Sequence, residues 1–222
     1  MDGYFEGIFS FDTGGFFVIR DYDTLTFVRC GNHKDRPSQA DNLHIDVWVN
    51  GQNVLKDAGS YKYNTSSELL KYFLGTISHN TVVLDGYDQM QKGPRFIWFD
   101  WSQAISSTLF ETDEYFEFTG TIHAYKHLEP NIFHTRRIRK YKKALFWEVE
   151  DSLKINNSYK IRQVWNTSLT LQSECEIIPQ QEVSIIKQKG YYSGYYGIKE
   201  ETQQLIFETD KPNQTTHIKI NP

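Results

Sequence analysis

The residues best suited to chemistry lie in one stretch, residues 53–90. Asp57 follows the short apolar run 53–56 and precedes a turn, which predicts a carboxylate at the end of a strand. His79 and Asn80 come directly before the β-branched run 81–84, which predicts an imidazole and an amide at the start of another strand. Rigid sheets commonly present functional groups where strands meet loops. Asp57 and His79 are therefore candidate site residues that could meet in space, and Asn80 is a third candidate.

The sequence leaves a structural role open for each of these residues. Asp57 could cap the turn that follows it, because carboxylates readily accept backbone N–H groups there. His79 and Asn80 could hold the start of their strand by hydrogen bonds. Asp41 is expected to satisfy loop N–H groups, and His44 is expected to be a hydrogen-bonded, partly buried histidine rather than a metal ligand.

Aromatic and cationic residues around this stretch could bind a ligand. Tyr61 and Tyr63 share one side of an extended segment and could form a platform for a sugar ring, although packing is the alternative for one of them. Arg95 and Arg136 could pair with a carboxylate. The alternatives are a solvated loop arginine for Arg95 and, for the basic run 136–143, an edge strand protected by charge.

Composition restricts the function classes. The chain has 222 residues, 15% aromatic residues and a net charge of −4, which argues against general nucleic-acid binding. No apolar run approaches the length of about 18 residues that a membrane helix needs. The first residues lack the basic start and apolar segment typical of a signal peptide. Cys30 and Cys175 are expected to be unpaired thiols.

The pattern of strands predicts an all-β fold. Residues 15–20 and 25–30 form a predicted hairpin, and residues 43–49 alternate between apolar and polar side chains. Asn50-Gly51 is a strong hairpin turn signal. Residues 67–74 are the only predicted helix near the site. These features favour an antiparallel β-sandwich that forms a single domain over residues 1–222.

An ordered set of motifs spans about residues 16 to 166. They are RPSQADNLHIDVW at 36–48, DAGSYKY at 57–63, HNTVVLDGYDQ at 79–89, HTRR at 134–137 and WEVED at 147–151. Together they resemble the C-terminal β-sandwich domain of the heparinase II/III-like family. The resemblance implies a polysaccharide lyase that cleaves uronic-acid-containing glycans, such as glycosaminoglycans or alginate, by β-elimination. It also implies an acidic polysaccharide partner and a bacterial, periplasmic or secreted location.

The resemblance also bears on the site residues. Family enzymes carry an α-helical toroid before the sandwich, with a Tyr acid/base and an Asn that neutralises the uronate, so this chain resembles a fragment of such an enzyme. Some members hold zinc with His, Asp and His. Asp57 and His79 match the second and third ligands, whereas Gln39 stands where the family has the first, and Pro37 replaces another family His. His79 and Asn80 are the catalytic candidates, and zinc is a possible cofactor.

Two function classes follow. One is the sandwich domain of a lyase; the other is a noncatalytic glycan-binding or scaffolding module that has lost the site. The substitutions at Pro37 and Gln39 favour the second, and Asp57, His79 and Asn80 favour the first. In either case we expect Gln39, Asp57 and His79 to converge in space.

Overall fold

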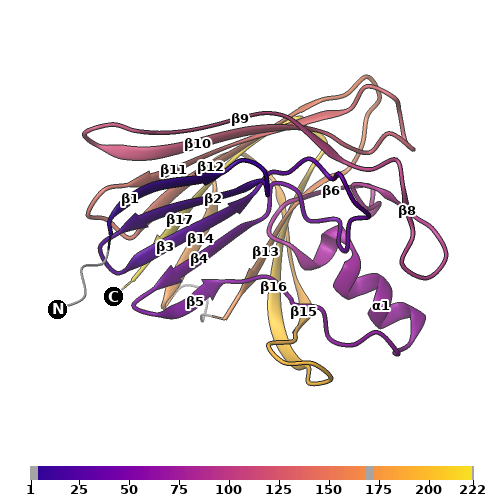
Figure 1. Ribbon diagram of the computed structural model, residues 1–222. Coiled ribbons are helices and arrows are strands. Elements are labelled where there is room, and N and C mark those ends of the chain that lie inside the picture. The colour runs from indigo at the N-terminus through magenta and orange to yellow at the C-terminus, as the bar shows by residue number, and fades with distance from the viewer. Residues whose placement is uncertain (1–4, 169–172, 222) are drawn as a thin grey trace.

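In the computed structural model, which describes residues 5–168 and 173–221, two large sheets pack face to face (Figure 1). The larger sheet contains β1 (Gly7–Phe11), β2 (Phe16–Asp21), β3 (Thr24–Arg29), β4 (Ile45–Val49), β5 (Gln52–Leu55), β6 (Val82–Leu84), β13 (Ile161–Thr167), β15 (Ser184–Tyr192) and β16 (Glu200–Thr209). The second contains β9 (Gln103–Glu111), β10 (Tyr115–His123), β11 (Phe133–Tyr141), β12 (Phe146–Lys154), β14 (Cys175–Pro179) and β17 (Asn213–Ile220). A short pair, β7 (Gln91–Lys92) and β8 (Trp98–Phe99), stands apart.

The pairings between these strands are antiparallel, which confirms the predicted β-sandwich. The predicted hairpin is β2–β3, and the Asn50-Gly51 turn joins β4 to β5. The alternation in and before β4 is real, because Leu43, Ile45, Val47 and Val49 are all buried while Trp48 is 40% exposed. A side-chain period of two thus sends one row into the core, and of the opposite row Trp48 reaches the surface while His44 is buried.

The core lies between the two sheets and is rich in large side chains. Trp147 from the second sheet and Trp165 from the larger one are both fully buried, and Trp147 Nε1 donates to Thr26 Oγ1 across the core (2.8 Å). Burial of a large apolar side chain contributes about 1.5–3 kcal/mol to folding. Cys30 and Cys175 are buried and unpaired, as expected.

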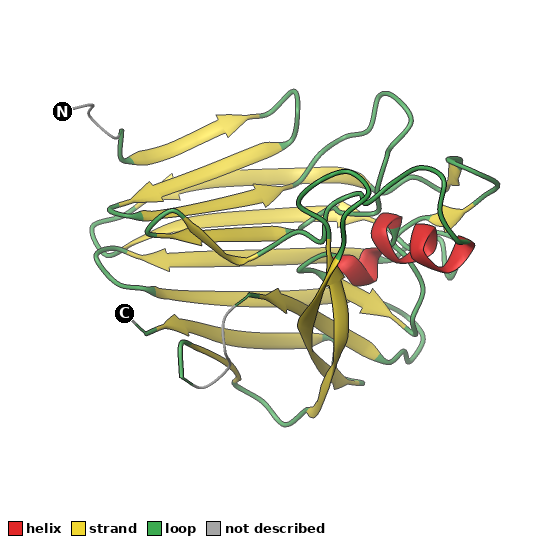
Figure 2. Ribbon diagram, turned by 90° about the horizontal axis from the view of Figure 1, so that it is seen from below, coloured by secondary structure: helices red, strands yellow, loops and turns green. Residues whose placement is uncertain are grey.

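The helix α1 (Ser67–Leu74) forms where it was predicted, and the short 3-10 helix η1 (Thr76–Ser78) follows it. Ser66 caps the N-terminus of α1, because its hydroxyl oxygen accepts the Leu69 N–H (3.3 Å). Phe73 is the buried residue of α1. In both overall views α1 lies at one end of the sandwich (Figures 1 and 2). Among the described residues, no helix is long and apolar enough to cross a bilayer.

The basic run 136–143 does not form an edge strand, so that alternative was wrong. Most of the run belongs to β11, which lies between β10 and β12 in the middle of the second sheet. Alternate side chains of β11 therefore point into the core, and Arg136 and Lys140 are buried there with acidic partners. Lys140 Nζ lies 2.7 Å from Asp21 Oδ2.

Candidate functional site

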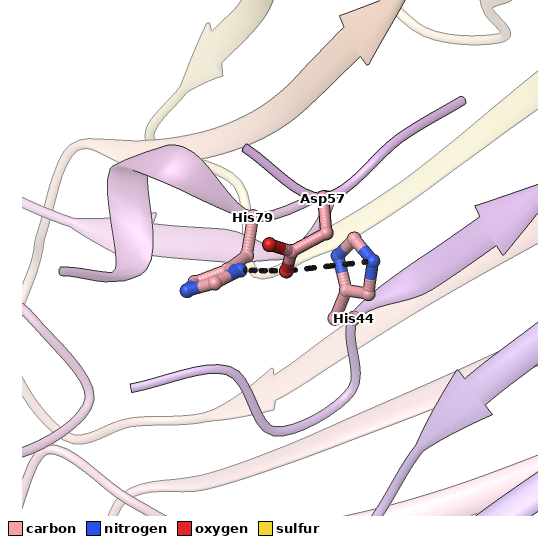
Figure 3. Close-up of side chains that lie close together, drawn as sticks. All are labelled: His44, Asp57 and His79. Atoms are coloured by element: carbon pink, nitrogen blue, oxygen red, sulfur yellow. Dashed lines mark hydrogen bonds and ion pairs between the residues drawn. The ribbon is translucent and has the colours of Figure 1, made fainter. Parts of the chain in front are cut away.

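Three ionisable side chains meet on the larger sheet where its strands end (Figure 3). His44 immediately precedes β4, Asp57 follows β5, and His79 follows η1. Asp57 Oδ2 lies 2.6 Å from His79 Nδ1 and 3.9 Å from His44 Nε2. Asp57 and His79 therefore meet as the sequence suggested. His44, which was expected to be a hydrogen-bonded, partly buried histidine rather than a metal ligand, lies beside them.

Local backbone geometry brings these residues together. Leu43 has a φ of 60°, which is unusual for a non-glycine residue and turns the chain just before His44. Gly59 has a φ of 83° and donates its N–H to Asp57 Oδ1 (2.6 Å). A Cβ atom at Gly59 would lie 2.1 Å from the Ser193 carbonyl oxygen, so only glycine fits at this crossing.

Asp57 and His79 stabilise each other's charged forms. Burial alone would raise the pKa of the Asp57 carboxyl, but the charge and hydrogen bond of His79, with help from His44 and the Gly59 N–H, lower this pKa to about 2. Burial alone would lower the pKa of His79, but the charge and hydrogen bond of Asp57 raise it. His79 is fully buried, and among the described residues its Nε2 has no hydrogen-bond partner.

The ring of His44 has a defined tautomer. Its Nδ1 lies 2.9 Å from the backbone nitrogen of Asn80, which can only donate, so Nδ1 accepts and carries no proton. The proton of this neutral ring therefore resides on Nε2, the nitrogen that faces Asp57. His44 supplies an N–H toward the Asp57 carboxylate rather than a lone pair.

Asn80 has a structural role, in contrast to the catalytic role predicted for it. Its Nδ2 donates to the carbonyls of Ile45 (2.9 Å) and Lys56 (3.3 Å), and its Oδ1 accepts from the backbone and side chain of Asn166. These contacts join β4, the residue that follows β5, and β13. Because the amide is buried and fully engaged, it is not available to neutralise a ligand carboxylate.

Arg136 also lies apart from any ligand surface, in contrast to the substrate-binding role predicted for it. It is fully buried and forms a bidentate pair with Asp151, through Nε (2.8 Å) and Nη2 (2.7 Å). Its Nη1 crosses the core to the carbonyls of Leu43 (2.7 Å) and Asn80 (2.5 Å), the residues next to His44 and His79. Arg136 thus holds the backbone next to His44 and His79 by hydrogen bonds from the core.

His134 and Gln163 complete this buried network. Both contact the Asp151 carboxylate at 2.6 Å, His134 through Nε2 and Gln163 through Nε2 of its amide. Burial alone would raise the pKa of Asp151, but Arg136 and His134 hold it well below its usual range. The motifs at 134–137 and 147–151 therefore pair with each other in the core, where His134 and Arg136 contact Asp151.

A scan of family models matches residues 6–221 to the C-terminal domain of heparinase II/III-like proteins. This chain belongs to the heparinase II/III-like family. It is 35% identical over 78 residues to a heparin-sulfate lyase of Bacteroides stercoris, a match that covers 32% of this chain and 12% of the relative.

Solved structures of the family share the fold. A heparinase III gene product aligns with a TM-score of 0.77 and 19% identity over 96% of this chain and 36% of that protein. The heparan sulfate lyase HepC of Pedobacter heparinus aligns with a TM-score of 0.78 and 17% identity over 99% of this chain and 37% of that one. The heparinase II/III-like chain described here thus spans little more than a third of the length of these structures.

Gln39 lies beside the site of this heparinase II/III-like domain. Its Nε2 donates to the carbonyls of Gly59 (3.2 Å) and Phe73 (2.9 Å), so it contacts the same glycine whose N–H binds Asp57. Gln39 therefore contacts backbone next to the site, in the segment that follows Asp57 and in the helix that precedes His79.

The two predicted tyrosines differ in their surroundings. Tyr61 is half-buried and stacks on Phe73 with a centroid distance of 5.4 Å, which is the packing alternative. Tyr63 is 69% exposed. Arg95 is exposed in the loop between β7 and β8, where it adopts a φ of 52°. Tyr63 and Arg95 are thus open to solvent, whereas Tyr61 is largely committed to the protein.

The donor set does not complete a zinc site of the kind implied by the family. His44, Asp57 and His79 have donor atoms within 4.8 Å of one another, as a metal cluster would. However, zinc needs nitrogen lone pairs, and the tautomer of His44 places a proton on the nitrogen that faces the site. Gln39 presents an amide that already donates to two carbonyls. Asp57 and His79 alone remain as ligands.

We accordingly expect zinc to leave the stability of this domain unchanged. A zinc ion that binds the folded state would raise the midpoint of thermal unfolding by mass action. Because we expect no such binding, the midpoint should be the same in excess zinc and in a chelator. Metal analysis of the dialysed protein provides the check. One equivalent of retained zinc, lost in Asp57→Ala, would show that His44 releases its bond to Asn80 and binds metal.

Proposed function

We propose that this chain is the sandwich domain of a polysaccharide lyase that cleaves uronic-acid-containing glycans by β-elimination. The observation that carries the proposal is the short Asp57–His79 hydrogen bond, which leaves His79 Nε2 without a partner among the described residues. The family and the similarity to a heparin-sulfate lyase support a glycosaminoglycan as the substrate.

The chemistry assigns a role to His79. β-Elimination removes the proton at C5 of a uronate, and the adjacent carboxylate then gains enolate character that a positive group must stabilise. Asp57 raises the pKa of His79 and orients its ring, so the imidazole favours the charged form with an N–H at Nε2. We assign His79 to the stabilisation of this developing charge, as the catalytic residue of this domain.

Other residues supply binding and positioning. Tyr63 and Arg95 are exposed and are proposed to contact the glycan, whereas Asn80 and Arg136 hold the segments that carry His44 and His79. The base that takes the C5 proton and the acid that protonates the leaving oxygen are proposed to come from an upstream α-helical toroid. The reaction would then take place between the two domains.

The test is release of unsaturated uronate, followed by ultraviolet absorbance, on heparan sulfate and on alginate. The 222-residue chain alone is expected to give no product, because general acid–base catalysis is typically worth about 10²–10⁴-fold in rate. The same chain joined to the proposed helical domain should release product. Steady product from the isolated chain would place the whole catalytic set within it.

A noncatalytic glycan-binding or scaffolding role is the second candidate. Complete burial of His79 and the replacements at Pro37 and Gln39 favour it. Binding of acidic glycan by the joined protein, without product on any uronate-containing polymer, would select this candidate over the lyase.

A further inference from the structure

Three aromatic side chains from separate loops form a cluster, in which Tyr63 and Tyr196 are exposed and Phe96 is half-buried. Tyr63 lies edge-on to Phe96, with ring centroids 5.8 Å apart and planes at 90°, and its centroid is 6.0 Å from that of Tyr196. Tyr63 and Tyr196 are 69% and 70% exposed. Exposed apolar groups that gather in one place commonly mark a binding surface. We call Tyr63, Phe96 and Tyr196 the aromatic platform.

The loops that carry the aromatic platform are fixed by backbone hydrogen bonds. Gly197 donates its N–H to the Tyr61 carbonyl (2.9 Å), and Ser193 donates to the Ala58 carbonyl (2.8 Å). In the third loop, Gly93 donates to the Ile97 carbonyl (2.9 Å). A surface that is ordered before binding loses less conformational entropy when a ligand arrives.

The aromatic platform is connected to the Asp57 site through the same backbone. Gly59 donates to Asp57 Oδ1 and also forms a bridge with Ser193, the residue that begins the loop carrying Tyr196. Tyr63 lies only six positions after Asp57 in sequence. The segments that carry Tyr63 and Tyr196 are therefore joined by backbone contacts to the segment that carries Asp57.

A cationic side chain contacts the platform, and a second lies over the neighbouring Tyr61. The Arg36 guanidinium lies 6.0 Å from the centroid of Phe96, and Lys62 Nζ lies 5.1 Å from that of Tyr61. Arg36 and Arg95 are both exposed. Aromatic faces suit the apolar face of a pyranose ring, and a guanidinium binds a carboxylate by paired, charge-assisted hydrogen bonds. This combination fits a sugar ring that bears an acid group.

We propose that the aromatic platform and Arg36 form a binding subsite for an acidic glycan, next to the Asp57–His79 site. A sugar ring of the chain lies on Tyr63 and Tyr196, and Arg36 pairs with a carboxylate or sulfate of that ring or its neighbour. The inference rests on the proposed action on uronate-containing glycans, and it adds the residues that hold the polymer outside the reacting unit.

The experiment measures binding of size-defined heparan sulfate oligosaccharides to the 222-residue chain by calorimetry. Tyr196→Ala should weaken binding about tenfold, in the range of an interface hot spot, and Tyr196→Phe should restore most of it because the ring face remains. Tyr195→Ala is the matched control, since Tyr195 is 78% exposed in the same loop yet makes none of the ring contacts of the platform. Arg36→Gln should weaken binding and reduce its dependence on salt.

Equal loss in Tyr195→Ala and Tyr196→Ala would overturn the subsite, as would equally tight binding of a neutral cello-oligosaccharide. Unchanged affinity in Tyr196→Ala would also overturn it. The measurement needs no catalysis, so the platform can be supported while the joined protein fails to release product. That result would reject the lyase proposal alone.

Discussion

Replacement of Arg136 by methionine is expected to lower the free energy of unfolding by about 3–5 kcal/mol, the usual cost of removing one member of a buried ion pair. Asp151 would remain in the core with His134 and Gln163 but without the guanidinium that neutralises it. The carbonyls of Leu43 and Asn80 would each lose a donor. Urea unfolding followed by tryptophan fluorescence measures the change, because Trp147 and Trp165 are buried in the core.

The adjacent residue provides the control. Arg137 points away from the core and pairs with Glu150, and the two side chains are 35% and 32% exposed. Arg137→Met should therefore change stability by less than about 1 kcal/mol, as for surface ion pairs in general. A loss of similar size in both variants would contradict the support role of Arg136. The double variant Arg136→Met with Asp151→Leu should recover part of the loss, because it leaves no unpaired buried charge.

In the joined lyase, His79→Ala is expected to lower kcat/KM by at least about 10²-fold, the scale of a single lost electrostatic contact in a transition state. The main change should be in kcat, because we propose that His79 acts on charge that develops during the reaction. Initial rates of unsaturated uronate formation over a range of heparan sulfate concentrations provide the measurement.

His123→Ala is the matched control for this experiment. His123 belongs to β10, where its Nε2 contacts the Pro130 carbonyl (2.8 Å), and it has no contact with Asp57 or His79 among the described residues. Its replacement should leave kcat/KM nearly unchanged. Normal kcat in His79→Ala, with intact folding shown by circular dichroism, would assign the charge stabilisation to another residue.

Local sequence patterns predicted the fold well because the information they use is local. The alternation of residues 43–49, the Asn50-Gly51 turn and the short helix at 67–74 each depend on neighbouring residues, and all three are present. The ordered motifs predicted the family, and the family model confirms it. Their positions at strand ends allowed Asp57 and His79 to meet, and the order of the family motifs led us to expect that they would.

The sequence could not show which strand would be central or which side chain would turn inward. Arg136 has the charge of a surface residue, and only its place in β11, opposite Asp151, explains its burial. His44 was expected to be a hydrogen-bonded, partly buried histidine, and its ring is buried and accepts the Asn80 N–H. Its position beside Asp57 could not be predicted, because it depends on the left-handed turn at Leu43. The amide of Asn80 is satisfied by two segments that lie far from each other in sequence, the β4–β5 hairpin and β13.

The contacts of Arg136 can form only late in the synthesis of the chain, after the segments that they hold have been made. Arg136 binds carbonyls of residues 93 and 56 positions earlier, so His44 and His79 are made long before the side chain that fixes their segments. Contacts at such separations must await the closure of long loops, which slows folding. A nascent chain that ends before β11 therefore holds the three site residues without their support and exposes the inner face of β4. Such intermediates are prone to aggregate, so yield should depend on rapid completion of the second half.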